Sequence, residues 1–282
     1  MRWALAALAI ALAPAIARAD HVPGHGASDA VRTLNSFGGG TGAATSRVML
    51  LQEASRATRT LSPNSSYSTS LIGEYSPHKW FSFGLQLPLQ VVDEDAARAK
   101  VGLGNVRVLT RLTLHADKLY HRILTFGINA GFPTRTIRFT VDPGKQWSQA
   151  PYVVFTRNYR RPFWQVFASA PIESRPAGTA IDLAAAAQGG YRFLGVLTPS
   201  AGLLTTVRVA SWCRAPTGDA SFCRGGRVTE LDRPIGSTAV YVTFGLSWAF
   251  KPWGLLAAGA QIPVTPKRDF DAAGTLSFQA TF

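Results

Sequence analysis

The sequence is short of acidic residues and, after its first residues, of long apolar runs. It has 16 Asp and Glu against 29 Lys and Arg, a formal net charge of +13. Beyond the N-terminus no segment approaches the ~20 apolar residues of a membrane-spanning helix, so we expect none in the mature chain. No run of about five basic residues and no nucleic-acid-binding signature occurs, which argues against a nucleic-acid partner. Lipopolysaccharide and anionic solutes remain as anionic partners.

Cysteine is also scarce, because Cys213 and Cys223 are the only two. No second cysteine pair exists and no histidine lies between them, so a metal clip is less favoured than a disulfide. An exported chain meets oxidising conditions. We therefore expect a disulfide between the two, worth about 2–3 kcal/mol in the loop-entropy model, with two free thiols as the alternative.

The N-terminus has the parts of a secretory signal peptide. Arg2 supplies a positive start, an apolar stretch follows to Ile16, and Ala17-Arg18-Ala19 offers a small-x-small cleavage site. We expect residues 1–19 to be removed, with a retained anchor as the alternative.

The next segment, 20–45, is rich in glycine and shows little alternation. It is expected to be a flexible extension that stays in the periplasm or enters a lumen. The rest of the chain, 46–282, is expected to form one β domain.

Apolar residues alternate with small or polar residues through most of this domain. Phe244, Leu246 and Trp248, for example, alternate with Gly245 and Ser247. One face of such a strand is bulky and the other polar, as a lipid-facing outside and a wet inside require. Turn residues separate twelve such segments: 46–57, 66–75, 80–91, 105–115, 122–133, 150–159, 163–172, 181–193, 199–211, 237–250, 253–264 and 273–282.

The connections between these segments alternate in length. Those after even-numbered segments are short (76–79, 116–121, 160–162, 194–198, 251–252), and those after odd-numbered segments are longer (92–104, 134–149, 173–180, 212–236, 265–272). Outer-membrane barrels have short periplasmic turns and longer outer loops. We therefore predict an all-β fold, a transmembrane antiparallel barrel of about 12 strands, with both termini periplasmic, in the outer membrane of a Gram-negative bacterium.

The last strand and the strand-opening aromatics agree with this fold. Leu276 and Phe278 alternate toward a terminal Phe282, which resembles the signal read by the barrel-assembly machinery. Aromatics that open strands on the short-turn side are expected to form a girdle against outer-membrane lipids. These aromatics are Trp80, Phe81, Trp164 and Trp253.

The predicted inner face carries several arginines. Arginine on the lipid face would cost about 2–4 kcal/mol at mid-depth, so inward placement is favoured. Guanidinium groups in a polar lumen favour anions such as carboxylates and phosphates. The alternative is that Arg107 and Arg111 pair with Glu74, Asp182 or another acid and merely hold the barrel together. The expected lumen residues are Arg107, Arg111, Arg192, Arg208, Gln86, Asn129 and Glu74.

No residue pattern calls for a cofactor or a metal. His78, His115 and His121 fall in or beside short turns, where solvated rim residues are more usual than a three-His metal site. A barrel hydrolase acting on lipid would need a Ser–His pair at the outer leaflet. No histidine falls on the outer half of a predicted strand or on an outer loop.

Two motifs resemble a known family. Residues 80–89 are Trp-Phe-Ser-Phe-Gly-Leu-Gln-Leu-Pro-Leu, and residues 101–105 are Val-Gly-Leu-Gly-Asn. This pattern, with a later Ile-Pro strand end at 262–263, resembles the MetA-like (phenol-degradation meta-pathway type) outer-membrane transporter family, most clearly over about 66–133. Asn105 stands where that family usually has Asp. The resemblance implies a barrel proposed to pass small, often hydrophobic compounds, and it carries no catalytic residues.

We therefore expect an outer-membrane channel for passive passage of small solutes, anionic or hydrophobic, and not an enzyme. The alternatives are a closed structural or lipid-interacting barrel, favoured by bulky candidates for the inner face such as Leu109 and Leu204, and a membrane-embedded lipid hydrolase. A soluble periplasmic β protein is a further alternative.

Overall fold

The computed structural model describes residues 43–57, 64–93, 100–117, 121–136, 146–175, 178–213, 223–224, 227–228, 235–251, 253–266 and 271–282. The predicted signal peptide and most of the Gly-rich extension therefore lie outside the described residues. No helix in the described part of the chain is long and apolar enough to cross a membrane.

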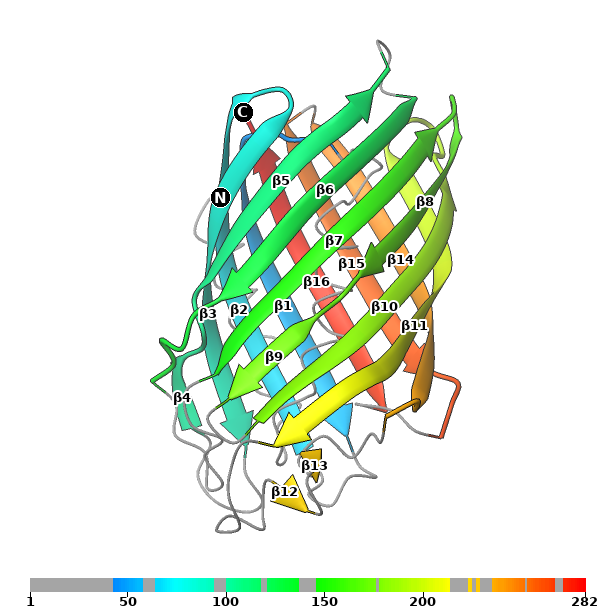
Figure 1. The fold of residues 1–282 in the computed structure, drawn as a ribbon. Coiled ribbons are helices and arrows are strands. Elements are labelled where there is room, and N and C mark those ends of the chain that lie inside the picture. The colour runs from blue at the N-terminus through cyan, green and yellow to red at the C-terminus, as the bar shows by residue number, and fades with distance from the viewer. Residues whose placement is uncertain are drawn as a thin grey trace.

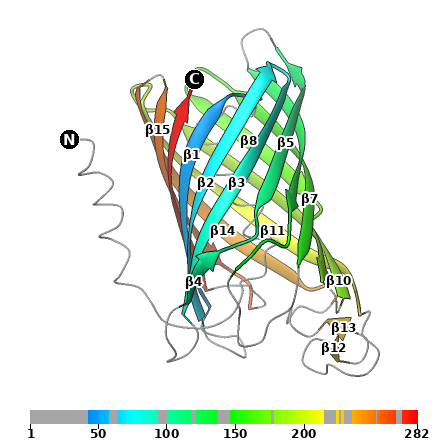
Figure 2. The same cartoon turned by 90° about the vertical axis from the view of Figure 1, so that its left-hand side faces the viewer.

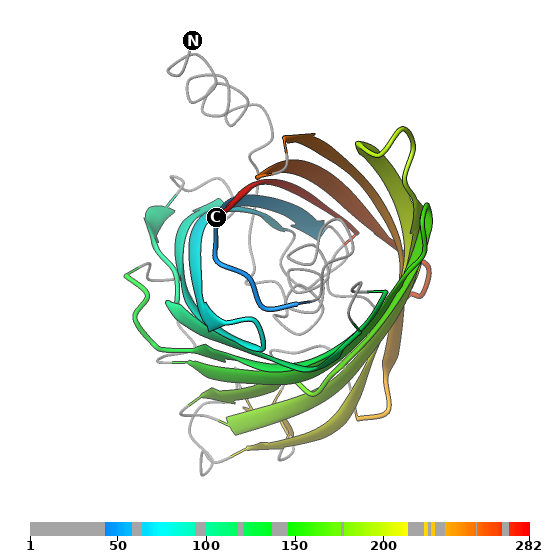
Figure 3. The same ribbon diagram turned by 90° about the horizontal axis from the view of Figure 1, so that it is seen from above.

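The chain forms a closed antiparallel barrel of twelve wall strands (Figures 1 and 3). Neighbouring strands pair in chain order, and β1 pairs with β16 to close the wall. Closure leaves no open sheet edge, as a β-structure in lipid requires. The wall strands are β1 (Arg47–Ala57), β2 (Asn64–His78), β3 (Phe81–Asp93), β5 (Arg107–Ala116), β6 (Arg122–Gly131), β7 (Trp147–Asn158), β8 (Pro162–Ser169), β10 (Gly178–Tyr191), β11 (Leu197–Cys213), β14 (Thr238–Lys251), β15 (Gly254–Pro263) and β16 (Ala272–Thr281).

Four short strands lie where the sequence pattern predicts loops or the end of a longer strand. They are β4 (Lys100–Leu103), β9 (Ile172–Arg175), β12 (Cys223–Arg224) and β13 (Arg227–Val228). β4 pairs with the end of β3, so the predicted loop 92–104 is partly strand. Four residues are too few to show a recognisable alternation. β12 and β13 pair only with each other.

Pro171 explains the break between β8 and β9. The sequence pattern predicts a single strand over 163–172 here. Proline has no N–H to give to the ladder, so pairing stops there. The flanking backbone still bonds: the Ala170 N–H donates to the Pro151 carbonyl at 3.0 Å, and the Asp182 N–H donates to the Pro171 carbonyl at 2.9 Å.

The predicted sorting of the connections is correct with one exception. The short connections lie at the end of the barrel that holds the C-terminus, and β4, β12 and β13 lie at the other end (Figures 1 and 2). The predicted longer connection 173–180 is wrong, because only residues 176–177 separate β9 from β10. Here the wall extends beyond the ~9–11 residues that cross a membrane, and β11 reaches 17 residues.

The outer face is apolar and the inner face is mixed. On β14, Phe244, Leu246 and Trp248 are about half exposed and point outward, whereas Tyr241 is fully buried inside. The interior also holds two apolar clusters. One contains Met49, Leu51 and Ile72 with Leu109 against them, and the other contains Tyr152, Val154, Phe167, Ala184, Ala186, Leu204, Ala239 and Tyr241. The core of this molecule therefore lies inside the barrel and fills part of its lumen.

Candidate functional site: the barrel lumen

A charged network lies on the inner face where β1, β2, β3 and β5 run side by side. The Arg47 guanidinium donates from Nε to Glu74 Oε2 at 2.7 Å, and its Nη2 lies 2.7 Å from the same oxygen. Arg111 Nε lies 3.5 Å from Glu74 Oε1. The Ser82 hydroxyl donates to that oxygen at 2.5 Å. One carboxylate therefore holds two guanidinium groups, and the network has an excess of one positive charge.

Strand register brings these side chains together. Arg47 lies directly opposite Glu74 between β1 and β2, and Ser82 lies opposite Arg111 between β3 and β5. All four alternate with lipid-facing neighbours, so their side chains share the inner face. Arg47 also donates from Nη1 to Gln279 on β16 at 3.1 Å, which links the network across the closing seam of the barrel.

Tyr152 of β7 reaches this network by lying across a glycine. A Cβ atom at Gly127 of β6 would be 2.3 Å from the Tyr152 hydroxyl oxygen, so only glycine leaves room for the ring. The Tyr152 hydroxyl donates to the Thr110 carbonyl of β5 at 3.3 Å. Gly127 thus allows an aromatic side chain to span two strand spacings along the wall.

The chain just before β1 runs inside the lumen at the end with the short connections (Figure 3). Arg111 donates from Nη1 to the Ala43 carbonyl at 3.3 Å, and the Ala44 N–H donates to Thr113 Oγ1 at 3.0 Å. Ala43 and Ala44 are 5% and 7% exposed. A hollow of about 500 Å³ remains beside this segment, between Ala44 and Trp253.

A second ion pair lies on the inner face of β10 and β11. Asp182 lies opposite Arg208 in the register of the two strands. Arg208 binds both carboxylate oxygens, through Nε and, at 3.1 Å, through Nη2. Among the described residues its Nη1 has no hydrogen-bond partner, so this end of the fork could bind a further acceptor.

The arginines and acids of the predicted lumen lie on the inner face, and only part of the pairing considered from the sequence is present. Arg111 contacts Glu74, whereas Asp182 is taken by Arg208. Arg107 is 6% exposed and lies opposite Gln86 on β3.

The other predicted lumen residues are two separate amide side chains and one arginine at the rim. The Gln86 amide donates to Ser70 Oγ at 2.9 Å, and Asn129 is half-buried on the inner face of β6. Arg192 lies just beyond β10, at the short-connection rim, and its Nη2 donates to Asn158 Oδ1 at 3.0 Å.

Sequence reasoning missed Arg47, Ser82 and Tyr152. Both faces of β1 are apolar, with Met49 and Leu51 inside and Val48 and Leu50 outside, so the alternation gave no direction there. The cost of arginine on the lipid face would have identified Arg47 as inward.

The predicted girdle aromatics lie beside short connections. Trp80, Trp164 and Trp253 are 50%, 37% and 51% exposed, and Phe81 is half-buried. His78 stacks on Trp80 with ring centroids 5.5 Å apart. Among the described residues, no three His, Cys, Asp or Glu side chains form a group that could hold a metal ion.

The remaining predicted residues are those of the terminal strand and the two cysteines. Leu276 and Phe278 are 41% exposed on the outer face of β16, and Phe282 is 81% exposed at the rim. Cys213 ends β11 and Cys223 begins β12, but their side chains lie outside the described part of the structure, so the disulfide stays a prediction.

A closed twelve-stranded antiparallel wall, apolar outside and polar within, defines the class of outer-membrane β-barrels. The predicted all-β antiparallel barrel of about 12 strands is thereby confirmed, and the periplasmic location of both termini stays a prediction. No protein-family model matches the sequence, and a search of curated proteins finds no match.

Solved structures do match. The COG4313 outer membrane channel from Pseudomonas putida F1 superposes with a TM-score of 0.62 at 12% identity, over 85% of this chain and 96% of that one. The KdgM porin in complex with disordered oligogalacturonate superposes with a TM-score of 0.50 at 9% identity, over 84% and 99%. At such identities the likeness concerns the fold.

Proposed function

We propose that this protein is an outer-membrane channel for passive passage of small solutes, with a preference for anions. The observation that carries the proposal is the charged network, in which Arg47 and Arg111 share the single carboxylate of Glu74. Arg107 adds a further guanidinium group to the inner face, whereas the charge of Arg208 is balanced by Asp182. Low-dielectric walls strengthen the field of these groups along the lumen.

Glu74 has a positioning role in this proposal. It holds the two guanidinium groups on the wall, where Arg47 also donates to Gln279 and Arg111 to the Ala43 carbonyl, so the network acts on a passing solute through its electrostatic field. Arginine binds carboxylates and phosphates through paired donors, and it stays charged at any physiological pH. The likeness to an outer membrane channel and to a porin supports a channel, and the KdgM porin structure is a complex with disordered oligogalacturonate.

A closed barrel is the second candidate, and specific observations favour it. Two apolar clusters occupy part of the interior, and the segment at Ala43 and Ala44 lies inside the lumen. Such a barrel would carry no steady current, or would pass apolar compounds sideways into the membrane. The resemblance to the MetA-like family is consistent with the second of these routes.

Several finer features belong to the same proposal. We propose that a signal peptide exports the chain, that the barrel-assembly machinery reads Leu276, Phe278 and Phe282, and that the exposed tryptophans anchor the short-connection end at a lipid interface. That end would face the periplasm. The Cys213–Cys223 disulfide would then form on the outer side.

Single-channel conductance in a planar bilayer under a KCl gradient tests the proposal. We expect a steady current with a reversal potential toward that of chloride. The triple variant Arg47→Gln, Glu74→Gln, Arg111→Gln removes the excess charge without stranding a carboxylate, so the chloride preference should fall toward unity. Arg157→Gln is the control, because Arg157 lies on the outer face and stacks over the Tyr159 ring at 4.9 Å. Absence of current from folded wild-type protein would favour the closed barrel.

A further inference from the structure

The wall formed by β8, β10, β11, β14 and β15 carries a row of uncharged amide side chains. Gln165 lies opposite Gln188, Gln188 opposite Gly202, Gly202 opposite Thr243, and Thr243 opposite Gln261. Because each pairing joins adjacent strands, these five residues, here called the amide row, follow one line around the inner face. Neighbouring members are about 5 Å apart.

Two glutamines of the amide row have unused hydrogen-bonding atoms. Gln261 is 4% exposed, and neither its Nε2 nor its Oε1 has a hydrogen-bond partner in the described structure. Gln165 is 1% exposed, and its Nε2 is likewise without a partner there. Buried amides without partners are costly and rare in folded proteins. Their presence on a lumen wall points to a ligand that supplies the missing bonds.

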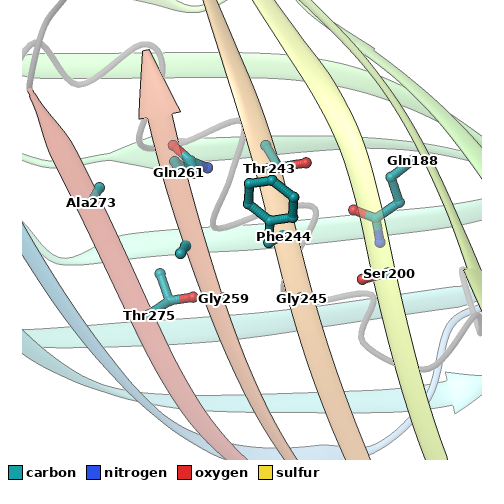
Figure 4. Close-up of a pocket in the computed structure, with 10 residues that line it drawn as sticks. Gln188, Ser200, Thr243, Phe244, Gly245, Gly259, Gln261, Ala273 and Thr275 are labelled. Atoms are coloured by element: carbon teal, nitrogen blue, oxygen red, sulfur yellow. The ribbon is translucent and has the colours of Figure 1, made fainter. Parts of the chain in front are cut away.

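A recess opens along the amide row (Figure 4). Gln188, Thr243 and Gln261 line it together with Ser200, and Gly245 and Gly259 leave its floor without side chains. It has room for about 30 Å³, which suits a group the size of a hydroxyl or a water. A carboxamide can both donate and accept hydrogen bonds, and so can a hydroxyl.

We propose that the amide row is a subsite for the hydroxyl groups of a polyhydroxylated carboxylic acid. The inference rests on the proposed channel and names the class of its solute. One hydroxyl enters the recess and satisfies Gln261, and another satisfies Gln165 farther along the row, while the charged network on the far side of the lumen attracts the carboxylate. β10 and β2 are six positions apart in the twelve-stranded wall, so the amide row faces the strand that carries Glu74.

The absence of charge around the row sets its specificity. β8 and β15 contain no charged residue, and the one charged residue on each of β10, β11 and β14 lies six or more residues along the strand from the row: Asp182, Arg208 and Lys251. The row therefore has no means of attracting the ionic end of a solute. It discriminates between acids by their hydroxyl content, because an apolar tail would leave the amides unpaired.

Current block by two six-carbon acids tests this inference. Gluconate carries hydroxyls along its chain, and hexanoate carries none. We expect gluconate to halve the chloride conductance of the full-length barrel at a lower concentration than hexanoate does. Gln261→Leu should raise the half-blocking concentration of gluconate about five-fold, the effect of losing one or two neutral hydrogen bonds. The value for hexanoate should stay the same.

Ser247→Ala is the control, since Ser247 is buried on the inner face of β14, four residues from Thr243 and outside the amide row. It should leave the gluconate-to-hexanoate ratio unchanged. Equal block by the two acids, or an unchanged ratio in Gln261→Leu, overturns the inference. Should Gln261→Leu fail to fold, Thr243→Val tests the neighbouring member of the row in the same way.

Calorimetric titration of gluconate onto the detergent-solubilised barrel separates this inference from the channel proposal. Binding that weakens in Gln261→Leu, without any current in bilayers, would keep the subsite and reject the channel. Chloride current without discrimination between the acids would keep the channel and reject the subsite. Sorbitol binding as tight as gluconate binding would overturn the assignment of an acid.

Discussion

The two walls of the lumen differ in how they satisfy buried polar groups. On the charged wall, formed by β1, β2, β3 and β5, both carboxylate oxygens of Glu74 have partners, supplied by Arg47, Arg111 and Ser82. The amide row on the other wall leaves Gln261 and Gln165 incomplete. A wall that satisfies itself is rigid and holds its charges in place, whereas an unsatisfied wall is ready for a ligand. The comparison suggests that one side of the lumen attracts a solute and the other identifies it.

The largest effect on the free energy of unfolding is expected when the charged wall loses the Glu74 carboxylate. Glu74→Gln removes the carboxylate that Arg47 and Arg111 share, while both guanidinium groups stay buried. Breaking a buried ion pair by removing one partner costs about 3–5 kcal/mol. We expect a loss of about 3 kcal/mol in the free energy of unfolding, measured by urea titration in lipid vesicles, together with a stronger chloride preference.

Asp182→Asn is the comparison for that variant, because Asp182 holds a single arginine. Its cost in unfolding free energy should be smaller than that of Glu74→Gln. Equal costs would mean that sharing one carboxylate between two arginines adds nothing to the wall.

A second prediction concerns Gly127, which leaves room for the Tyr152 ring beside the charged wall. Gly127→Val places side-chain atoms where the Tyr152 ring lies, since even a Cβ would be 2.3 Å from its hydroxyl. Overpacking of this kind costs about 1–3 kcal/mol. We expect a lower urea midpoint and a wider spread of conductance levels. Gly73→Ala is the control, because nothing lies within 4 Å of its added Cβ.

The strand count, the alternation and the inward direction of Arg107, Arg111 and Arg208 could be predicted because each depends on neighbours in sequence. The partners could not, because they depend on lateral register. Arg47 meets Glu74, and Arg208 meets Asp182, only once the strands are aligned. The amide row is the extreme case, since Gln165, Gln188 and Gln261 are far apart in sequence. Pairing across β8 to β15 brings them into one line.

The smallest effect is expected where the chain before β1 meets the charged wall. Thr113→Val removes the hydroxyl that accepts the Ala44 N–H at 3.0 Å and changes little else in shape. Losing one such bond costs about 1 kcal/mol. The segment inside the lumen should then leave its place more often, raising mean single-channel conductance by up to about two-fold with selectivity unchanged.

Thr156→Val is the matched control for that change, because Thr156 is fully buried on the inner face and its hydroxyl has no partner among the described residues. Its conductance should equal that of the wild type. The charged wall holds Ala43 as well, through Arg111, so Thr113→Val should loosen the segment without releasing it. An unchanged conductance in Thr113→Val would mean that Arg111 alone holds the segment, and Arg111→Lys would then have the larger effect. A fall in conductance would contradict the idea that this segment narrows the lumen.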